Sequence, residues 1–144
     1  MAAFVDLLKR QGTFAKVVAT SNIAYHSRYI ADMGPKLLKR LKEIIPEPKP
    51  KSEKWLSSSI PKNRWDQDEN RCSSPEYHTN NLLGSVLFEE TMALLPENAI
   101  TIEFAPHGLL QAIMKKGMPN GTHIPLTQRG NKSNLNFFLN ALGK

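Results

Sequence analysis

Apolar residues recur at helical spacing in several stretches of the chain. Phe4, Leu7 and Leu8 share one face ahead of Gly12, which predicts a short first helix. A longer amphipathic helix is predicted by the apolar stripe at Ile30, Met33, Leu37, Leu38, Leu41, Ile44 and Ile45. We expect this second helix to bend or restart at Gly34-Pro35. The same spacing predicts helices over residues 77–95 and 109–117, and a last helix over 135–142.

Four shorter segments have the composition or alternation of strands. They run over residues 14–19, 54–60, 100–104 and 122–127. Residues 46–54 carry three prolines between charged residues and predict a surface loop, and 61–74 are polar and irregular. Because strands and helices alternate with strand–helix connections, we predict an α/β fold with parallel strands.

The composition is that of an ordinary globular protein with a basic excess. Among 144 residues, 19 Lys and Arg against 13 Asp and Glu give a net charge of +6, which favours acidic partners. There is no arginine-rich tract with interleaved aromatic residues, so nucleic acid is not expected as a partner. We expect neither a membrane span nor a secretory signal, and the single cysteine, Cys72, fits a reducing, cytoplasmic location.

Basic residues come mainly in two places, which are Lys36, Lys39, Arg40 and Lys42, and then Lys49, Lys51 and Lys54. The surplus charge lies at Lys36, Lys39, Arg40, Lys42, Lys49 and Lys51. Two interpretations stay open at this level: a non-catalytic module that docks an acidic carrier protein or synthase subunit, and a solvated helix face without a partner.

His26 is the residue best placed for acid–base chemistry. Imidazole exchanges protons readily near neutral pH, and His26 lies where a strand-like segment gives way to a helix. A purely structural histidine remains the alternative. His107 has a comparable position after the strand over 100–104, whereas His78 and His123 fit surface or packing positions. The four histidines lack the spacing of a metal site, so none is expected.

No nucleophile accompanies this candidate base. The sequence contains no G-x-S-x-G elbow and no G-x-x-x-x-G-K-[ST] phosphate loop. Ser57, Ser58 and Ser59 fit packing or solvated positions. Cys72 is either a reactive thiol or an inert residue of its polar loop.

Ordered segments of the whole chain resemble one known domain. They are IAYHS at 23–27, SEKWLSSSIP at 52–61, YHTNNLLGSVLFEE at 77–90, EFAPHGLLQAIMKKG at 103–117, IPLTQRG at 124–130 and NLNFFLNALG at 134–143. Together they closely resemble the C-terminal half of the malonyl/acetyl transferase domain of animal type I fatty acid synthase, and an insect version more than a vertebrate one. The resemblance implies a partial acyltransferase fold. Residues 1–22 would end the ferredoxin-like small subdomain, and 23–144 would form the C-terminal part of the α/β-hydrolase-like large subdomain.

The resemblance also assigns site residues. His26 matches the family's catalytic general base, with Tyr25 where phenylalanine is usual. The backbone carbonyl of Asn81, in a segment where Ser85 replaces the usual proline, would accept the other ring N–H of His26 and orient it. Candidate substrate-binding residues are Ile23, Ala24, Tyr25, Ser27 and His107.

The implied reaction is a two-step acyl transfer. A serine attacks the thioester of acetyl- or malonyl-CoA, and the acyl group then moves to the phosphopantetheine thiol of an acyl carrier protein. No bound cofactor is implied, and the remainder of the synthase chain would be a partner. The serine elbow belongs to the family's upstream half, which would place Met1 inside the domain. We therefore expect the free chain to be a catalytically inactive fragment, or not to fold stably unaided.

Overall fold

A computed structural model describes residues 2–144. The chain forms two compact units, Met1–Val86 and Leu87–Lys144, and each is described by itself. The predicted change of subdomain after residue 22 falls inside the first unit and remains a prediction.

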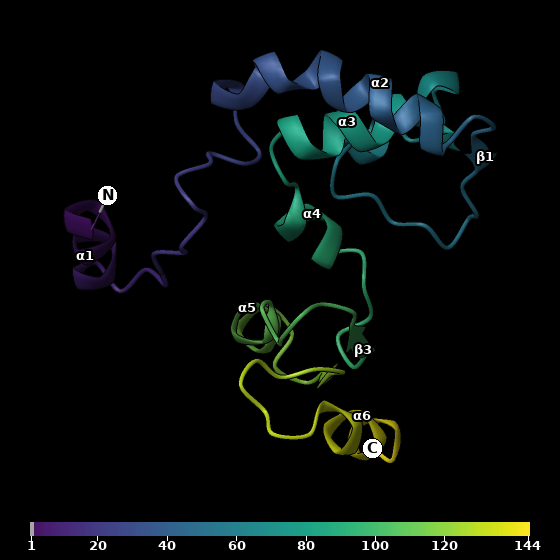
Figure 1. Ribbon diagram of the computed structural model, residues 1–144. Helices are drawn as coiled ribbons and strands as arrows, with labels where there is room; N and C mark the ends of the chain where they lie inside the picture. Colours follow the sequence, from purple (N-terminus) through teal and green to yellow (C-terminus); the bar gives the residue numbers. More distant parts are fainter. Residues whose placement is uncertain (1) are drawn as a thin grey trace. The chain divides into compact units, whose positions relative to one another are not determined.

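The first unit is mainly helical (Figure 1). Helix α1 spans Ala2–Arg10, the 3-10 helix η1 spans Arg28–Met33, and helices α2 and α3 span Gly34–Ile44 and Pro75–Leu83. The predicted first helix and the predicted restart at Gly34-Pro35 are confirmed. Pro35 suits this restart because the first turn of a helix has no use for the amide hydrogen that proline lacks.

Helices α2 and α3 pack side by side, as Figure 1 shows. Gly34 is buried at their contact, where a Cβ atom would lie 2.9 Å from Cδ1 of Leu83. Lys42 of α2 pairs with Glu76 of α3 at 3.1 Å. A hydrogen bond from its own backbone amide, together with the ammonium of Lys42, holds the pKa of the Glu76 carboxyl below its ordinary value.

The segments between these helices are less regular than predicted. The strands predicted over 14–19 and 54–60 are wrong, because neither segment pairs with a neighbouring strand among the described residues. Residues 46–74 instead hold strands β1 (Lys49–Pro50) and β2 (Cys72–Ser73), which pair antiparallel. Two short 3-10 helices, η2 (Lys62–Arg64) and η3 (Asp68–Asn70), lie between them.

Buried polar contacts centred on Tyr77 hold the long loop of the first unit against α3. Tyr77 is 7% exposed, and its hydroxyl lies 2.9 Å from Oγ of Ser57 and accepts from Nε1 of Trp55 at 3.3 Å. The Lys51 ammonium lies 4.0 Å from the centre of the Tyr77 ring. Burial acts to raise the pKa of the Tyr77 hydroxyl, but these hydrogen bonds and the Lys51 charge outweigh burial and lower the pKa.

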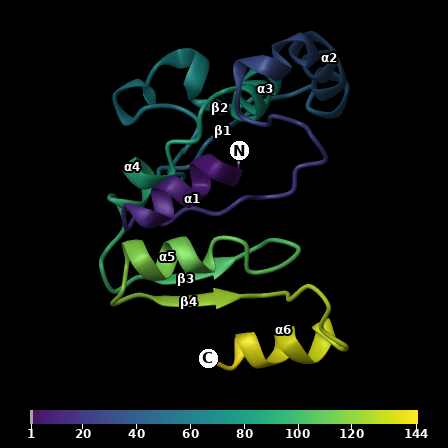
Figure 2. The ribbon, with the colours of Figure 1, turned by 90° about the vertical axis from the view of Figure 1, so that its left-hand side faces the viewer.

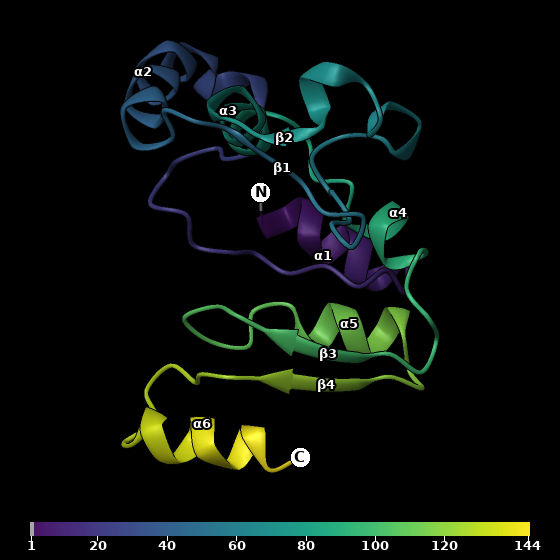
Figure 3. The same cartoon turned by 90° about the vertical axis from the view of Figure 1, so that its right-hand side faces the viewer.

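The second unit contains the parallel strands that the sequence predicts. Strands β3 (Ile100–Glu103) and β4 (Thr122–Pro125) run in the same direction, with Ile100 opposite Thr122 and Glu103 opposite Pro125 (Figures 2 and 3). Its helices are α4 (Phe88–Met92), α5 (Gln111–Gly117) and α6 (Asn134–Leu142). Ile124 and Leu126 form a buried cluster with Ala141 of α6. This mixture of helices and small sheets confirms the α/β class.

One predicted helix is broken. The apolar spacing over 77–95 continues without a gap, but α3 ends at Leu83 and α4 begins only at Phe88. Gly84 is extended (φ −82°, ψ 163°), and its amide donates to the carbonyl of Asn80 at 2.7 Å. Glycine is a poor helix former, so the break falls at the position where helix continuation is least favourable. The end of α3 leaves backbone carbonyls without helical partners.

Candidate functional site

The loop that precedes η1 carries an unusual backbone. Ser21, Asn22 and His26 have positive φ angles of 53°, 61° and 58°. Residues other than glycine adopt this left-handed region rarely and at an energetic cost, and such residues cluster at functional sites. The loop therefore needs contacts elsewhere in the unit to hold His26 in its conformation.

Helix α3 supplies those contacts through its free carbonyl groups. The backbone N–H of His26 donates to the carbonyl of Leu82 at 2.9 Å. The ring Nδ1 of His26 lies 2.9 Å from the carbonyl of Asn81. Both carbonyls belong to the last turn of α3, where the break after Leu83 removes their helical donors. The contact between Asn81 and His26 that the family resemblance implies is thus present.

This geometry selects the tautomer of the neutral His26 ring. A backbone carbonyl can only accept, so Nδ1 must carry the hydrogen and the neutral ring holds its lone pair at Nε2. The side chain is exposed, and Nε2 has no hydrogen-bond partner among residues 2–144. The ring is therefore oriented by one nitrogen and open to a substrate at the other, which is the arrangement of a general base.

A second layer of contacts holds Asn81 itself. Nδ2 of Asn81 donates to Oγ of Ser59, and Nδ2 of the neighbouring Asn80 donates to the carbonyl of Ser59 at 3.1 Å. The sequence by itself predicts only a packing or solvated position for Ser59. The one available signal was a run of three hydroxyl residues, which is too common to indicate a particular partner.

The residues around His26 have distinct surroundings. Ile23 and Tyr25 are 40% and 45% exposed, and Ala24 is also exposed. The Ser27 hydroxyl donates to the Ala24 carbonyl at 2.6 Å and accepts from the amide of Tyr29 at 3.3 Å. Ser27 therefore caps η1, which begins two residues after His26.

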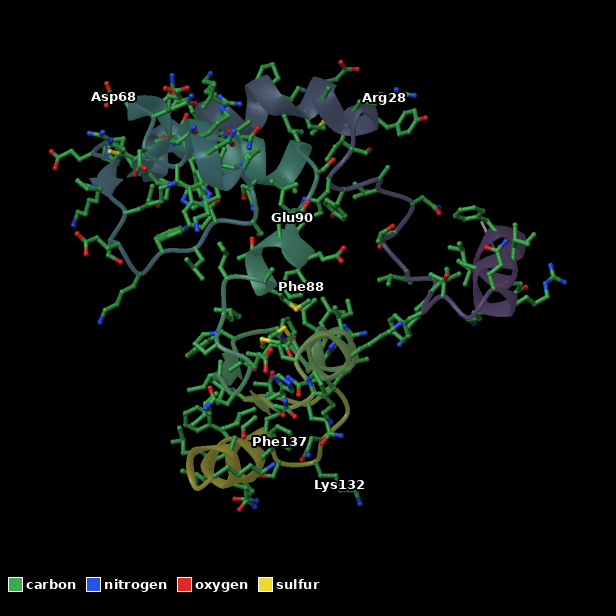
Figure 4. The ribbon with its side chains drawn as sticks, turned by 180° about the vertical axis from the view of Figure 1, so that it is seen from behind. Arg28, Asp68, Phe88, Glu90, Lys132 and Phe137 are labelled. Carbon is green, nitrogen blue, oxygen red and sulfur yellow. The ribbon has the colours of Figure 1, made fainter. Side chains whose placement is uncertain are left out.

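A cation lies at the start of η1. The guanidinium of Arg28 is 5.3 Å from the centre of the Tyr29 ring. The Arg28 side chain lies at the N-terminal end of η1 (Figure 4). Arg28 has no ion-pair partner among the described residues. It adds a positive charge two residues after His26.

His107 belongs to the second unit. It is half-buried in the turn between β3 and α5, and its carbonyl accepts from the amide of Leu109 at 2.7 Å. Glu103 at the end of β3 accepts from the Leu110 amide at 2.9 Å and from the Gln111 side chain at 2.8 Å. This carboxylate fixes the start of α5 and hence the turn that carries His107.

The other histidines have structural partners. His78 Nε2 is 2.9 Å from Oγ of Ser73, and the His123 ring lies between Oγ1 of Thr101 at 2.8 Å and the carbonyl of Met118 at 2.9 Å. Over residues 2–144, no three His, Cys, Asp or Glu side chains gather as metal ligands. None of the helices described is both long and apolar enough to cross a membrane.

The second unit also contains an apolar cavity of about 170 Å³. It is lined by α4, β3 and α5, with Phe88, Met92 and Met114 among its walls. His107 is not among the lining residues, so the cavity gives no substrate site to this histidine.

A comparison with known protein families agrees with the α/β class of the fold. The model of one family, described as the acyl transferase domain, matches residues 1–144. The match covers the first unit with its His26–Asn81 contact and the second unit with its parallel strands. The chain belongs to the acyl transferase domain family.

Proposed function

We propose that this chain is part of the malonyl/acetyl transferase domain of a fatty acid synthase and that His26 is the general base of that domain. The proposal rests on one observation above all, the hydrogen bond between Nδ1 of His26 and the carbonyl of Asn81. That bond leaves Nε2 free to take a proton from a nucleophile and to return it to a leaving thiol. Family membership supports acyl transfer in general, and the ordered segments of the sequence support the synthase context.

In the proposed reaction, a serine hydroxyl attacks the thioester carbonyl of acetyl- or malonyl-CoA. His26 Nε2 takes the hydroxyl proton as the Ser O–C bond forms, and CoA leaves as its thiol after protonation. The thiol of a phosphopantetheinyl carrier protein then attacks the acyl-serine. His26 Nε2 takes the proton of this thiol and returns a proton to the serine oxygen as the Ser O–C bond breaks. The reaction proceeds in the cytoplasm and needs no resident cofactor.

The residues beside His26 are proposed to contact the acyl group. Ile23, Ala24 and Tyr25 are exposed on the approach to His26, and we assign them, with Ser27, to substrate binding. Tyr25 offers a hydroxyl that can hydrogen-bond an acyl carboxylate. His107 of the second unit is proposed as a further substrate-binding residue, as the family resemblance implies.

The nucleophile is proposed to lie outside these 144 residues, because the sequence contains no G-x-S-x-G elbow. We expect the purified chain to acquire no covalent label from radiolabelled malonyl-CoA, since the base alone cannot form an acyl-enzyme. Autoradiography after gel electrophoresis under denaturing conditions measures this. Labelling of the wild-type chain that is lost in His26→Ala would show instead that the chain holds its own nucleophile.

The carrier protein is proposed to meet the first unit. Residues 1–86 carry 14 Lys and Arg against 9 Asp and Glu, whereas residues 87–144 carry 5 against 4. On α2, Arg40 and Lys42 are paired with Glu43 and Glu76, but Lys36 and Lys39 are exposed and have no ion pair among the described residues. These two lysines are therefore the cations of α2 that are available to an acidic partner.

We therefore expect the double substitution Lys36→Glu and Lys39→Glu to weaken binding of an acidic acyl carrier protein at least tenfold at low salt. Lys132→Glu in the second unit makes a change of the same sign at an exposed position (Figure 4) and is the control. Isothermal titration calorimetry at two salt concentrations measures both variants. Equal affinities for the double variant and wild type would assign these lysines to a solvated face. If the chain binds the carrier protein strongly but the full-length protein transfers no acyl group, the non-catalytic docking module is favoured instead.

A further inference from the structure

A chain of hydrogen bonds runs from the buried interior of the first unit to the exposed His26. Oγ of Ser57 lies 2.9 Å from the Tyr77 hydroxyl and accepts from the Ser59 amide at 3.2 Å. Ser59 then binds Asn81, whose carbonyl accepts from the His26 ring. Ser57 is 3% exposed and Tyr77 is 7% exposed. The inner end of the chain is therefore fixed by packing, while its outer end carries the candidate base.

Ser59 is the link between these two ends. Its amide donates to Ser57, its carbonyl accepts from Asn80, and its hydroxyl accepts from Asn81. All three polar groups are thus engaged, two of them by the last turns of α3. Helix ends fray unless such contacts hold them, and the carbonyls that orient His26 lie in the part of α3 most prone to fraying.

We propose that Ser59 is a positioning residue, which selects the Nδ1–H form of His26 by holding the Asn81 carbonyl in place. This inference deepens the proposed function and rests on it. Ser59 forms no hydrogen bond with His26 among the described residues, so its effect on the ring passes only through Asn81. Imidazole free in water favours the Nε2–H form, so the Nδ1–H form persists only while the carbonyl stays aligned with the ring.

The test reads the tautomer of the His26 ring directly, in the 144-residue chain itself. Long-range ¹H–¹⁵N spectra of chain labelled at its histidine rings give the ratio of Nδ1–H to Nε2–H, and His26→Gln assigns the signal. We expect Nδ1–H to dominate in the wild type. In Ser59→Ala the ratio should fall by about threefold to tenfold, which corresponds to the loss of one hydrogen bond.

Matched variants separate positioning from a general loss of structure. Ser59→Thr keeps the hydroxyl and should restore the wild-type ratio. Ser58→Ala removes a neighbouring hydroxyl for which no hydrogen bond is seen among the described residues, and should leave the ratio unchanged. Asn81→Ala removes the same contact from the other side while it keeps the carbonyl, and should shift the ratio as Ser59→Ala does. Ser59→Ala combined with Asn81→Ala should shift the ratio little further than either single substitution does.

Fluorescence of Trp55 and Trp65 checks that each variant folds, since both tryptophans lie in the first unit. If Ser59→Ala fails to fold, Asn81→Ala gives the same reading. A folded Ser59→Ala or Asn81→Ala chain with the wild-type ratio would overturn the role of Ser59 and leave the proposed function standing. A wild-type ring in the Nε2–H form would overturn both.

Discussion

Replacement of His26 by alanine is expected to slow acyl transfer about 10²- to 10⁴-fold in an acyltransferase that contains these residues together with its nucleophilic serine. This range is the usual contribution of a positioned general base. The loss should fall on kcat rather than on KM for the acyl-CoA, because the ring is needed to move protons and not to bind the thioester. Transfer of labelled malonyl groups to a carrier protein, measured at saturating substrate, gives the two constants separately.

His78→Ala is the matched control for this experiment. It removes a histidine from the same unit, whose ring lies 2.9 Å from Oγ of Ser73 and edge-on to the Tyr77 ring. No hydrogen bond or ring contact joins His78 to His26 among the described residues. We expect transfer by this variant to stay within a few-fold of wild type. A similar loss in both variants would mean that each acts through stability, and an unchanged rate in His26→Ala would remove His26 from the reaction.

Tyr77→Ala should destabilise the first unit by about 3–5 kcal/mol, the usual cost when a buried aromatic side chain is truncated to alanine. Tyr77 is 7% exposed, and its hydroxyl is shared with Ser57 and Trp55. Truncation therefore leaves a cavity and also removes one hydrogen-bond partner of the buried Ser57 hydroxyl. Chemical denaturation followed by the fluorescence of Trp55 and Trp65 reports on this unit alone.

Two further substitutions separate the contributions of the ring and of the hydroxyl to this loss of stability. Tyr77→Phe keeps the ring, so we expect it to cost about 1–3 kcal/mol from the unsatisfied hydrogen bonds. Tyr29→Ala removes a tyrosine that is 77% exposed and should change the free energy of unfolding by less than about 0.5 kcal/mol. If Tyr77→Ala costs no more than Tyr29→Ala, the polar cluster does not support the unit.

The regular elements that sequence alone predicted are those whose pattern is local. The first helix, the restart at Gly34-Pro35, and strands β3 and β4 follow from spacing along the chain. The strands predicted over 14–19 and 54–60 failed because a strand is defined by its partner and not by its own composition. The helix over 77–95 failed at Gly84, where residues 84–87 leave the helical conformation between two segments with the same apolar spacing.

The candidate site was predictable only in part. The residues alone singled out His26 as a possible base but could not exclude a structural histidine. The contact with Asn81 joins positions 55 residues apart, and it was reached through the family resemblance. Nothing in the sequence indicated that the Ser59 hydroxyl binds Asn81 or that the Leu82 carbonyl holds the His26 amide. Such backbone contacts leave little mark on residue identity, because any residue can supply a carbonyl.

The most direct test of the account is to locate the acyl group on the polypeptide encoded by the full-length transcript. The polypeptide is incubated briefly with malonyl-CoA, digested, and mapped by mass spectrometry, with His26→Ala treated in parallel. We expect a malonyl adduct on a serine outside these 144 residues, formed far more slowly in His26→Ala. An adduct on a residue within them, or equal rates of acylation in the two proteins, would contradict it.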